Sequence, residues 1–355
     1  MTSALRRPIL RAMERAVRGE GGTAPPGRDL PAKGSERIIR LVLVGLIVVA
    51  GIVGVTRLFS SSAHAGGSSP GKSPAVGSTR PAGTTAVPTA TGSGGTALDT
   101  SLFAPGSCMA FPPTHGNRHL TVFLDAGHGG VDPGGVGATS SGQTVYEKNL
   151  TLPVELDATK LLRAAGFRVV DSRTNGGPVS IPRAGDLSEG VYTTEGAHAE
   201  VAARDICANL GKANVLIGIY FDAGPSAQNA GSITSYDADR PFAAENKRLA
   251  DLLQHDVLTA MNAQGWQIPN GGVNLDIYEG GPALTTAAAN YDHLMLLGPA
   301  KAGFFSTPST MPGAVIEPLF ATDPFEADIA VSHKGQEIIA GGILQTIEQF
   351  FAGDS

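Results

Sequence analysis

Apolar residues in the C-terminal two thirds of the chain follow two patterns. Continuous apolar runs, some ending in glycine-rich loops, are typical of strands buried on both faces. We predict such strands at residues 120–127, 167–172, 214–221, 231–236, 294–297 and 314–318. Apolar residues at helical spacing predict helices at residues 149–165, 197–210, 242–262 and 335–351. In the first helix we expect Pro153 in the first turn, where its missing N–H costs nothing.

The alternation of these strands and helices predicts the fold class. It indicates an α/β domain with a largely parallel, twisted sheet of about six strands and helices on both faces. In such sheets, functional side chains gather at the carboxyl ends of the strands. We place this domain at residues 107–353.

A separate apolar run occupies residues 41–55, between Arg40 and Arg57. Flanking apolar residues extend it toward the roughly 20 residues of a membrane span, and we predict a transmembrane signal-anchor helix at residues 38–59. Before Leu41, nine Lys or Arg residues outnumber four Asp or Glu residues. Residues 1–37 should therefore stay in the cytoplasm, and the rest of the chain should lie on the extracytoplasmic face of the cell membrane.

A cleaved export signal is the alternative to a retained anchor. Ala63 and Ala65 flank one residue in a small-x-small pattern, and cleavage near Ala65 would release a secreted protein. Residues 60–106 are rich in Gly, Ser, Thr and Pro, which predicts a disordered linker, because such a segment buries too little apolar surface to offset its chain entropy.

The net charge limits which partners the chain can bind, and the export of the domain bears on the state of its cysteines. The net charge of −6 disfavours a nucleic-acid partner, which needs clustered Lys and Arg, and we expect no nucleotide partner either. The chain has two cysteines, Cys108 and Cys207. In an exported protein such a pair favours a disulfide over two thiols, with two buried, unbonded cysteines as the alternative. A bridge would pin the start of the domain to a predicted helix.

Two residues at predicted element ends could carry metal chemistry. His128 lies in LDAGHGG, where the first strand ends in a glycine-lined loop that lets the backbone approach an ion closely. Glu147 lies in YEKNL, just ahead of a helix. Its carboxylate could favour the positive end of that helix or bind a metal ion, and spacing alone does not separate these alternatives.

Six motifs in order carry a resemblance to a known family. The chain from residue 120 to 351 resembles the zinc-dependent N-acetylmuramoyl-L-alanine amidases of the cell-wall type (type 3 catalytic domain). The motifs are LDAGHGG, YEKNL, FRVVDSRT, RDICAN, VLIGIYFDAG and PGAVIEPLF. The resemblance implies that His128 and Glu147 bind Zn²⁺, and that Glu317 acts as general base and acid. The implied reaction is hydrolysis of the amide bond between N-acetylmuramic acid and L-alanine of peptidoglycan by a metal-activated water.

The chain departs from this family at one ligand. The family's third ligand is a His in a Ser-Ile-His-x-Asn motif, and Tyr220 occupies that position here. Tyr220, or Asp222 after a small shift, could complete the site, water could fill the position, or the metal could be lost. Tyr220 could also be an ordinary strand aromatic. His198 and His293 are the histidines that we would inspect for a replacement ligand.

Loss of the metal would leave a catalytically impaired domain that binds the cell wall or regulates a partner hydrolase. Glu317 has a structural alternative too, as a cap of nearby backbone or a partner of an arginine. We expect Arg173, Thr174, Arg204 and Asn209 to be framework residues, the arginines through carboxylate pairs. The Gly-rich stretch at residues 270–289 is expected to be a lid or a surface loop.

Overall fold

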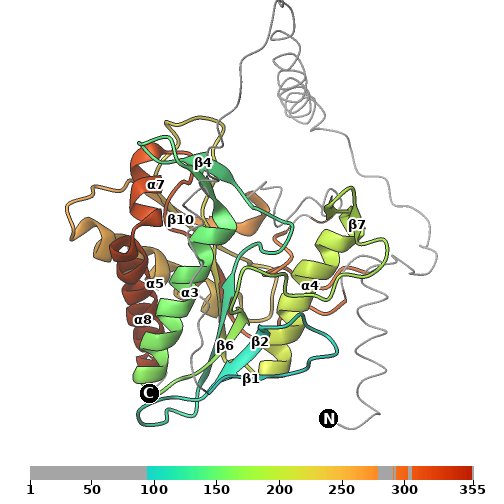
Figure 1. The fold of residues 1–355 in the computed structure, drawn as a ribbon. Helices are drawn as coiled ribbons and strands as arrows, with labels where there is room; N and C mark the ends of the chain where they lie inside the picture. The colour runs from blue at the N-terminus through green and yellow to red at the C-terminus, as the bar shows by residue number, and fades with distance from the viewer. Residues whose placement is uncertain (1–93, 279–290, 292, 303–305, 354–355) are drawn as a thin grey trace, which may run out of the picture. The chain divides into compact units, whose positions relative to one another are not determined.

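The computed structural model describes residues 94–278, 291, 293–302 and 306–353. The predicted cytoplasmic segment, the transmembrane helix, the cleavage site and most of the predicted linker lie outside these residues. Within the described part of the chain, no helix is both long and apolar enough to cross a membrane. The described residues contain an eight-stranded mixed sheet and five α-helices (Figure 1).

The sheet is parallel at its centre and gains antiparallel strands on both sides. Its order is β1 (Thr96–Ala97), β2 (Ser107–Phe111), β6 (Arg168–Arg173), β3 (Thr121–Ala126), β9 (Val215–Ile219), β12 (Gly313–Glu317), β10 (Ser232–Tyr236) and β11 (Asn270–Leu275). The four strands β6, β3, β9 and β12 are mutually parallel. Strand β2 is antiparallel to β6, and β10 is antiparallel to β12. The predicted parallel character is confirmed, but the sheet has eight strands rather than six.

Helices cover both faces of the sheet, as predicted. Helices α3 (Glu147–Ala164), α5 (Ala243–Asn262) and α8 (His333–Ala352) lie on one side of the sheet, and α4 (Thr194–Gly211) lies on the other (Figure 1). Because side chains alternate along a strand, each central strand contributes side chains to two hydrophobic cores, one on each face of the sheet. Leu124 and Ile217 join the core under α3, α5 and α8, whereas Phe123 and Leu216 join the core under α4.

Local capping fixes where several helices begin. The Thr193 side chain accepts a hydrogen bond from the Gly196 N–H at the start of α4. Asp323 does the same for α7 (Pro324–Val331), and Ser332 does so for α8. Each cap satisfies an N–H group that has no partner within its helix. Helix α3 begins at Glu147, earlier than predicted, so Pro153 lies inside the helix and not in its first turn.

Two predicted segments have a different structure. The apolar run at residues 294–297 is a buried turn rather than a strand, with Leu297 N–H bonded to Leu294 C=O. Its side chains fill the α4-side core without pairing with the sheet. Residues 270–275 form β11 rather than a loop, followed by the short 3₁₀ helix η1 (Asp276–Tyr278). Residues 279–289 lie outside the described residues.

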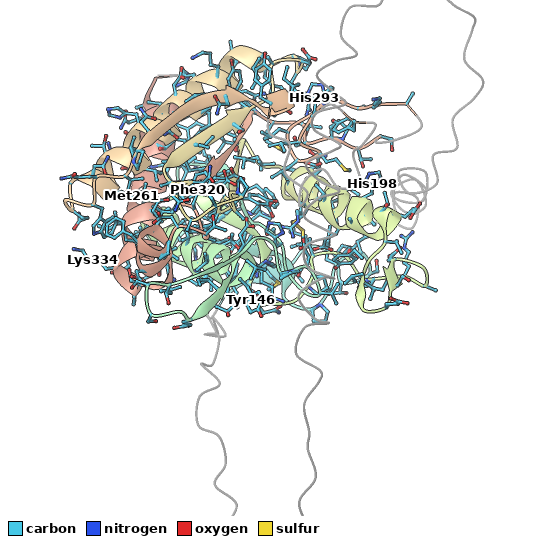
Figure 2. All side chains as sticks on the ribbon, turned by 90° about the horizontal axis from the view of Figure 1, so that it is seen from above. Tyr146, His198, Met261, His293, Phe320 and Lys334 are labelled. Carbon is cyan, nitrogen blue, oxygen red and sulfur yellow. A yellow bond between two sulfur atoms is a disulfide. The ribbon has the colours of Figure 1, made fainter. Side chains whose placement is uncertain are left out.

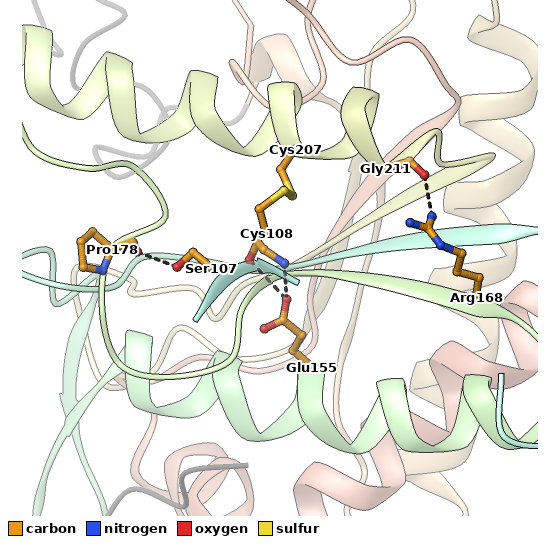
Figure 3. Close-up of a disulfide and its surroundings, with 8 residues drawn as sticks. Ser107, Cys108, Glu155, Arg168, Pro178, Cys207 and Gly211 are labelled. Carbon is orange, nitrogen blue, oxygen red and sulfur yellow. Dashed lines mark hydrogen bonds between the residues drawn. A yellow bond between two sulfur atoms is a disulfide. The ribbon is translucent and has the colours of Figure 1, made fainter. Parts of the chain in front are cut away.

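The start of the domain also differs from the prediction. Residues 94–106 had been included in the linker, yet Leu102 and Phe103 are buried in the α4-side core. Cys108 on β2 and Cys207 on α4 form the expected disulfide (Figure 3). This bond joins the first strands of the domain to the helix that covers them.

Two small hairpins complete the described elements. Strands β4 (Val136–Ala138) and β5 (Thr144–Tyr146) precede α3, and strands β7 (Leu187–Ser188) and β8 (Val191–Tyr192) precede α4. The chain segment that joins β3 to β4 starts at the carboxyl end of a central strand. Ionisable side chains gather there.

Candidate metal and catalytic site

The loop after β3 holds His128 in a strained backbone conformation. His128 has φ of 60°, and the next two residues, Gly129 and Gly130, also have positive φ. A residue with a Cβ atom pays a steric cost in this left-handed region, and such strain persists where the surroundings impose it. Here Arg204 of α4 donates a hydrogen bond to the His128 carbonyl at 2.8 Å. Gly129 and Asp132 also exchange backbone hydrogen bonds.

The His128 imidazole lies between two carboxylates. Its Nδ1 is 2.8 Å from Asp132 Oδ2, and its Nε2 is 2.9 Å from Glu147 Oε2. The imidazole is buried, and among the described residues Nε2 has no partner in hydrogen-bond geometry. Burial alone would lower the pKa of His128, but the charges of Glu147 and Asp132 outweigh it and raise the pKa to about 9. Nε2 therefore faces a position where a proton or a metal cation is favoured.

Glu147, the first residue of α3, accepts hydrogen bonds from backbone N–H groups of two other segments. Its Oε1 accepts a hydrogen bond from Phe221 N–H at 2.9 Å, and its Oε2 accepts one from Gly135 N–H at 2.7 Å. Each carboxylate oxygen keeps a further lone pair. A Cβ atom at Gly134 would lie 2.7 Å from Glu147 Oε2 and 2.6 Å from the His128 ring. The glycine therefore leaves open the space where the two side chains meet.

This pair fits a zinc ion. An imidazole nitrogen and a carboxylate oxygen are ordinary zinc ligands, and a metal-binding His usually donates its other N–H to a carboxylate. Asp132 Oδ2 is placed to accept that hydrogen bond from Nδ1. Asp132 is not among the site residues predicted from the sequence. Its signal was an acidic residue four positions after His128 in the same loop.

Tyr220 lies beside His128, but its hydroxyl bonds elsewhere. The rings of Tyr220 and His128 pack edge to face, with centroids 5.4 Å apart. The Tyr220 hydroxyl donates a hydrogen bond to Asp125 Oδ2 at 2.9 Å. Burial and the charge of Asp125 raise the pKa of Tyr220 well above its usual value. The side chain is thus held as a neutral phenol, which is a weak zinc ligand.

Arginines tie the strand ends together, as expected of framework residues. Arg204 pairs with Asp125 and also contacts Glu200 at 3.3 Å. Arg173 differs from the expected carboxylate pairing, because its hydrogen bonds go to backbone carbonyls and one hydroxyl, including the carbonyl of Gly127 at 3.0 Å. Asn209 bonds Thr310 at 2.8 Å, away from the His128 loop. The hydrogen bonds of Arg173 and Arg204 fix the backbone that positions His128.

Glu317 lies at the same edge of the sheet. It is the last residue of β12, and the preceding pair in the register is Ile316 with Ile219, so Glu317 follows beside Tyr220. Strand alternation places it on the face shared by Val315 and Tyr220, the face that α4 covers. The Glu317 side chain is half-buried.

A small cavity of about 20 Å³ lies on the α4 side of this cluster, lined by His128, Asp132, Tyr220 and residues of α4. It is large enough for one water molecule. Neither histidine considered as a replacement ligand lines this cavity. His198 lies on α4, and Figure 2 shows His293 well apart from His198. His293 instead contacts Asp237, at 2.8 Å.

The chain also matches a family of known proteins. The Amidase_3 model, described as N-acetylmuramoyl-L-alanine amidase, matches residues 122–349. The chain is similar to the germination-specific N-acetylmuramoyl-L-alanine amidase of Bacillus subtilis (strain 168). The two are 26% identical over 230 residues, which are 65% of this chain and 79% of the relative.

Solved structures of two amidases are also similar. The CwlD amidase from Clostridioides difficile, in complex with the GerS lipoprotein, is 20% identical, with 66% of this chain and 100% of that chain covered and a TM-score of 0.49. The N-acetylmuramyl-L-alanine amidase Ami1 from Mycobacterium smegmatis is 18% identical, with 67% and 100% covered and a TM-score of 0.46.

Proposed function

Because the chain belongs to the Amidase_3 family of N-acetylmuramoyl-L-alanine amidases, we propose that it hydrolyses the amide bond between N-acetylmuramic acid and L-alanine of peptidoglycan. The family is zinc-dependent, and its substrate lies outside the cytoplasm. One observation carries the proposal: the buried His128 Nε2 lies 2.9 Å from Glu147 Oε2 and has no hydrogen-bond partner among the described residues. Such an atom is costly unless a proton or an ion occupies the position that it faces.

In this proposal each residue has a distinct role. His128 and Glu147 hold the ion, and Asp132 orients the imidazole through Nδ1. Bound zinc would lower the pKa of a bound water to about 7 and polarise the scissile carbonyl. Glu317 accepts the proton of the attacking water and returns it to the leaving amine, as a carboxylate at the same sheet edge can. The Tyr220 hydroxyl stays bonded to Asp125 and does not bind the ion.

The Tyr220–Asp125 hydrogen bond favours a second candidate function. A site with only two protein ligands binds zinc more weakly than a three-ligand site. Weak binding would leave a catalytically impaired domain that binds the cell wall or regulates a partner hydrolase. The two candidates differ in metal content and in turnover.

We also propose that residues 38–59 anchor the domain in the cytoplasmic membrane. The support is the apolar run between Arg40 and Arg57, with an excess of basic residues before it. Peptidoglycan lies on the far side of that membrane, so an anchored domain would face its substrate. Secretion after cleavage near Ala65 is the alternative.

Substitution of Tyr220 tests the function. The full chain, purified in detergent, is assayed for zinc by elemental analysis and for release of stem peptide from muropeptides. We expect bound zinc and measurable release from the native chain. Tyr220→His should bind zinc at least about tenfold more tightly, because an imidazole as third protein ligand can add the 1.4 kcal/mol that this factor requires. His128→Ala should lose both properties, with release reduced by more than about 100-fold.

Tyr220→Phe is the matched control, because it keeps the ring and removes only the hydroxyl bond to Asp125. It should resemble the native chain in zinc content. Release by Tyr220→His but not by the native chain would favour the impaired domain. Absence of zinc and of release in both would show that the hydrolase proposal is wrong.

A further inference from the structure

A second cluster of potential metal ligands lies at the opposite edge of the sheet. Strands β10 and β11 run in parallel, and their last residues, Tyr236 and Leu275, are register partners. The residues that follow are Asp237 and Asp276, so two carboxylates emerge side by side. Because β10 is antiparallel to β12, this edge is opposite to the one that carries His128.

His293 completes the cluster from a distant part of the sequence. Its Nδ1 is 2.8 Å from Asp237 Oδ2 and 3.3 Å from Asp276 Oδ2. One ligand atom from each residue lies within 4.8 Å of the other two. Two atoms on one zinc ion in tetrahedral geometry, each at 2.0–2.2 Å, are roughly 3.4 Å apart. The three side chains are therefore already close to the spacing that a shared ion requires.

One oxygen of the cluster is buried without a hydrogen bond. The Asp237 side chain is 0% exposed, and its Oδ2 has no hydrogen-bond partner among the described residues. The other ligand groups are held by the backbone: Asp237 Oδ1 accepts from Asp239 N–H at 2.8 Å, and Asp276 Oδ2 accepts from Leu294 N–H at 3.0 Å. A buried carboxylate oxygen that faces an imidazole and has no hydrogen bond is a position that suits a cation.

The carboxylates in and around the cluster outnumber the cationic groups near it. Asp239, on the surface, is 3.6 Å from His293 Nε2 and adds a third carboxylate. The guanidinium of Arg240 is nearby, but it donates its hydrogen bonds to the carbonyls of Leu297, Gly298 and Ser309.

We propose that Asp237, Asp276 and His293 form a second metal site, which binds a divalent transition-metal cation such as Zn²⁺ or Mn²⁺. One imidazole and two carboxylates suit these ions, whereas Mg²⁺ and Ca²⁺ prefer oxygen ligands alone. The ion ties the ends of β10 and β11 to the buried turn at residues 294–297, which follows His293 directly. The role is structural, and it does not depend on the proposed hydrolase activity. The alternative is an ion pair between protonated His293 and the two carboxylates.

Isosteric substitutions separate a metal site from an ion pair. Asp237→Asn and Asp276→Asn each keep one oxygen for the existing backbone hydrogen bond and remove the charge. The test uses the full chain carrying His128→Ala, which removes the first site. After equilibrium dialysis against ZnCl₂ or MnCl₂, we expect one ion per chain by elemental analysis. Adding Asp276→Asn should weaken binding at least tenfold, whereas adding Asp239→Asn should change it less than twofold.

A second measurement uses the native chain, so it does not depend on whether a variant folds. In crystals of the native chain equilibrated with MnCl₂, an anomalous-scattering peak is expected between the three side chains. No peak there, together with no ion in the His128→Ala chain, would overturn the metal site and leave the ion pair. Binding that survives Asp276→Asn unchanged would overturn it as well. Stem-peptide release by the native chain is scored separately, so failure of one proposal does not count against the other.

Discussion

At the scale of single residues, position 220 carries a phenol where the family resemblance implies an imidazole, and we expect this difference to weaken zinc binding. The phenol hydroxyl bonds Asp125, which also pairs with Arg204. A Cβ atom at Gly127 would lie 2.3 Å from the Tyr220 ring, so the glycine makes room for it. The ring is thus accommodated beside His128 without occupying the position between His128 and Glu147. This arrangement is compatible with an ion bound by His128 and Glu147, as the proposed hydrolysis requires.

A buried carboxyl group on β6 predicts a pH dependence of stability. Asp171 is fully buried, and burial raises its pKa to about 8, although Thr159 donates a hydrogen bond to it at 2.6 Å. In the unfolded chain the pKa is about 3.9. The stabilisation is therefore complete below pH about 4 and is lost as the pH rises toward 8, by at most about 1.4 kcal/mol per pH unit. Asp171→Asn, which can still accept the Thr159 hydrogen bond, should flatten the curve.

The measurement is the free energy of unfolding in urea at several pH values between about 4 and 8. Asp251→Asn serves as the matched control, because Asp251 is half exposed and pairs with the exposed Lys247. Parallel curves for the native chain and Asp171→Asn would contradict the prediction.

At the scale of elements, the strands and helices with strong apolar periodicity were predicted well, and the weakly patterned ones were missed. Strand β11 has the sequence NGGVNL and is only partly buried, so it carries no continuous apolar run. Helix α7 is short and begins at a proline, and β1 has only two residues. The run at residues 294–297 is as apolar as a strand, but its burial comes from the α4-side core. Periodicity reports burial, and it does not report pairing partners.

The disulfide between β2 and α4 predicts a measurable loss of stability on reduction. Cys108 and Cys207 close a loop with a sequence separation of 99 residues, and opening it restores conformational freedom to the unfolded chain. We expect reduction to lower the free energy of unfolding by about 2–4 kcal/mol. Urea unfolding with and without a reducing agent measures this change.

A Cys108→Ala/Cys207→Ala chain controls for other effects of the reductant, which should leave its stability unchanged. Equal loss in both chains would show that the bridge does not contribute. Alkylation of both cysteines under non-reducing conditions would show that the bridge is absent from the native protein.

At the scale of the whole molecule, strand direction separates two clusters of polar side chains. His128, Tyr220 and Glu317 follow or end parallel central strands and share one edge of the sheet. The reversal of β10 sends Asp237 and Asp276 to the other edge. One sheet therefore presents a candidate catalytic site and a candidate structural metal site at opposite ends.

The anchor that we propose at residues 38–59 also concerns the whole chain, and it predicts membrane retention. Native protein should remain in the membrane pellet after high-salt and alkaline washes and dissolve only in detergent. Leu46→Arg/Val49→Arg should release it, because each arginine at the centre of a span costs about 2.5–3.5 kcal/mol. Leu46→Ala/Val49→Ala should stay bound. Recovery of the native domain from the medium, with a new N-terminus near Ala65, would instead support cleavage.

The sequence by itself determined the fold class and the order of the main elements, because burial periodicity is a local signal, whereas the pairing of His128 with Glu147 was implied only by the family resemblance. Tertiary structure decided what depends on distant residues. It set the direction of β10, paired the Tyr220 hydroxyl with Asp125, and brought His293 to Asp237 and Asp276. These outcomes depend on which segments become neighbours, and the free energy of such contacts is not encoded in the local pattern of any one segment.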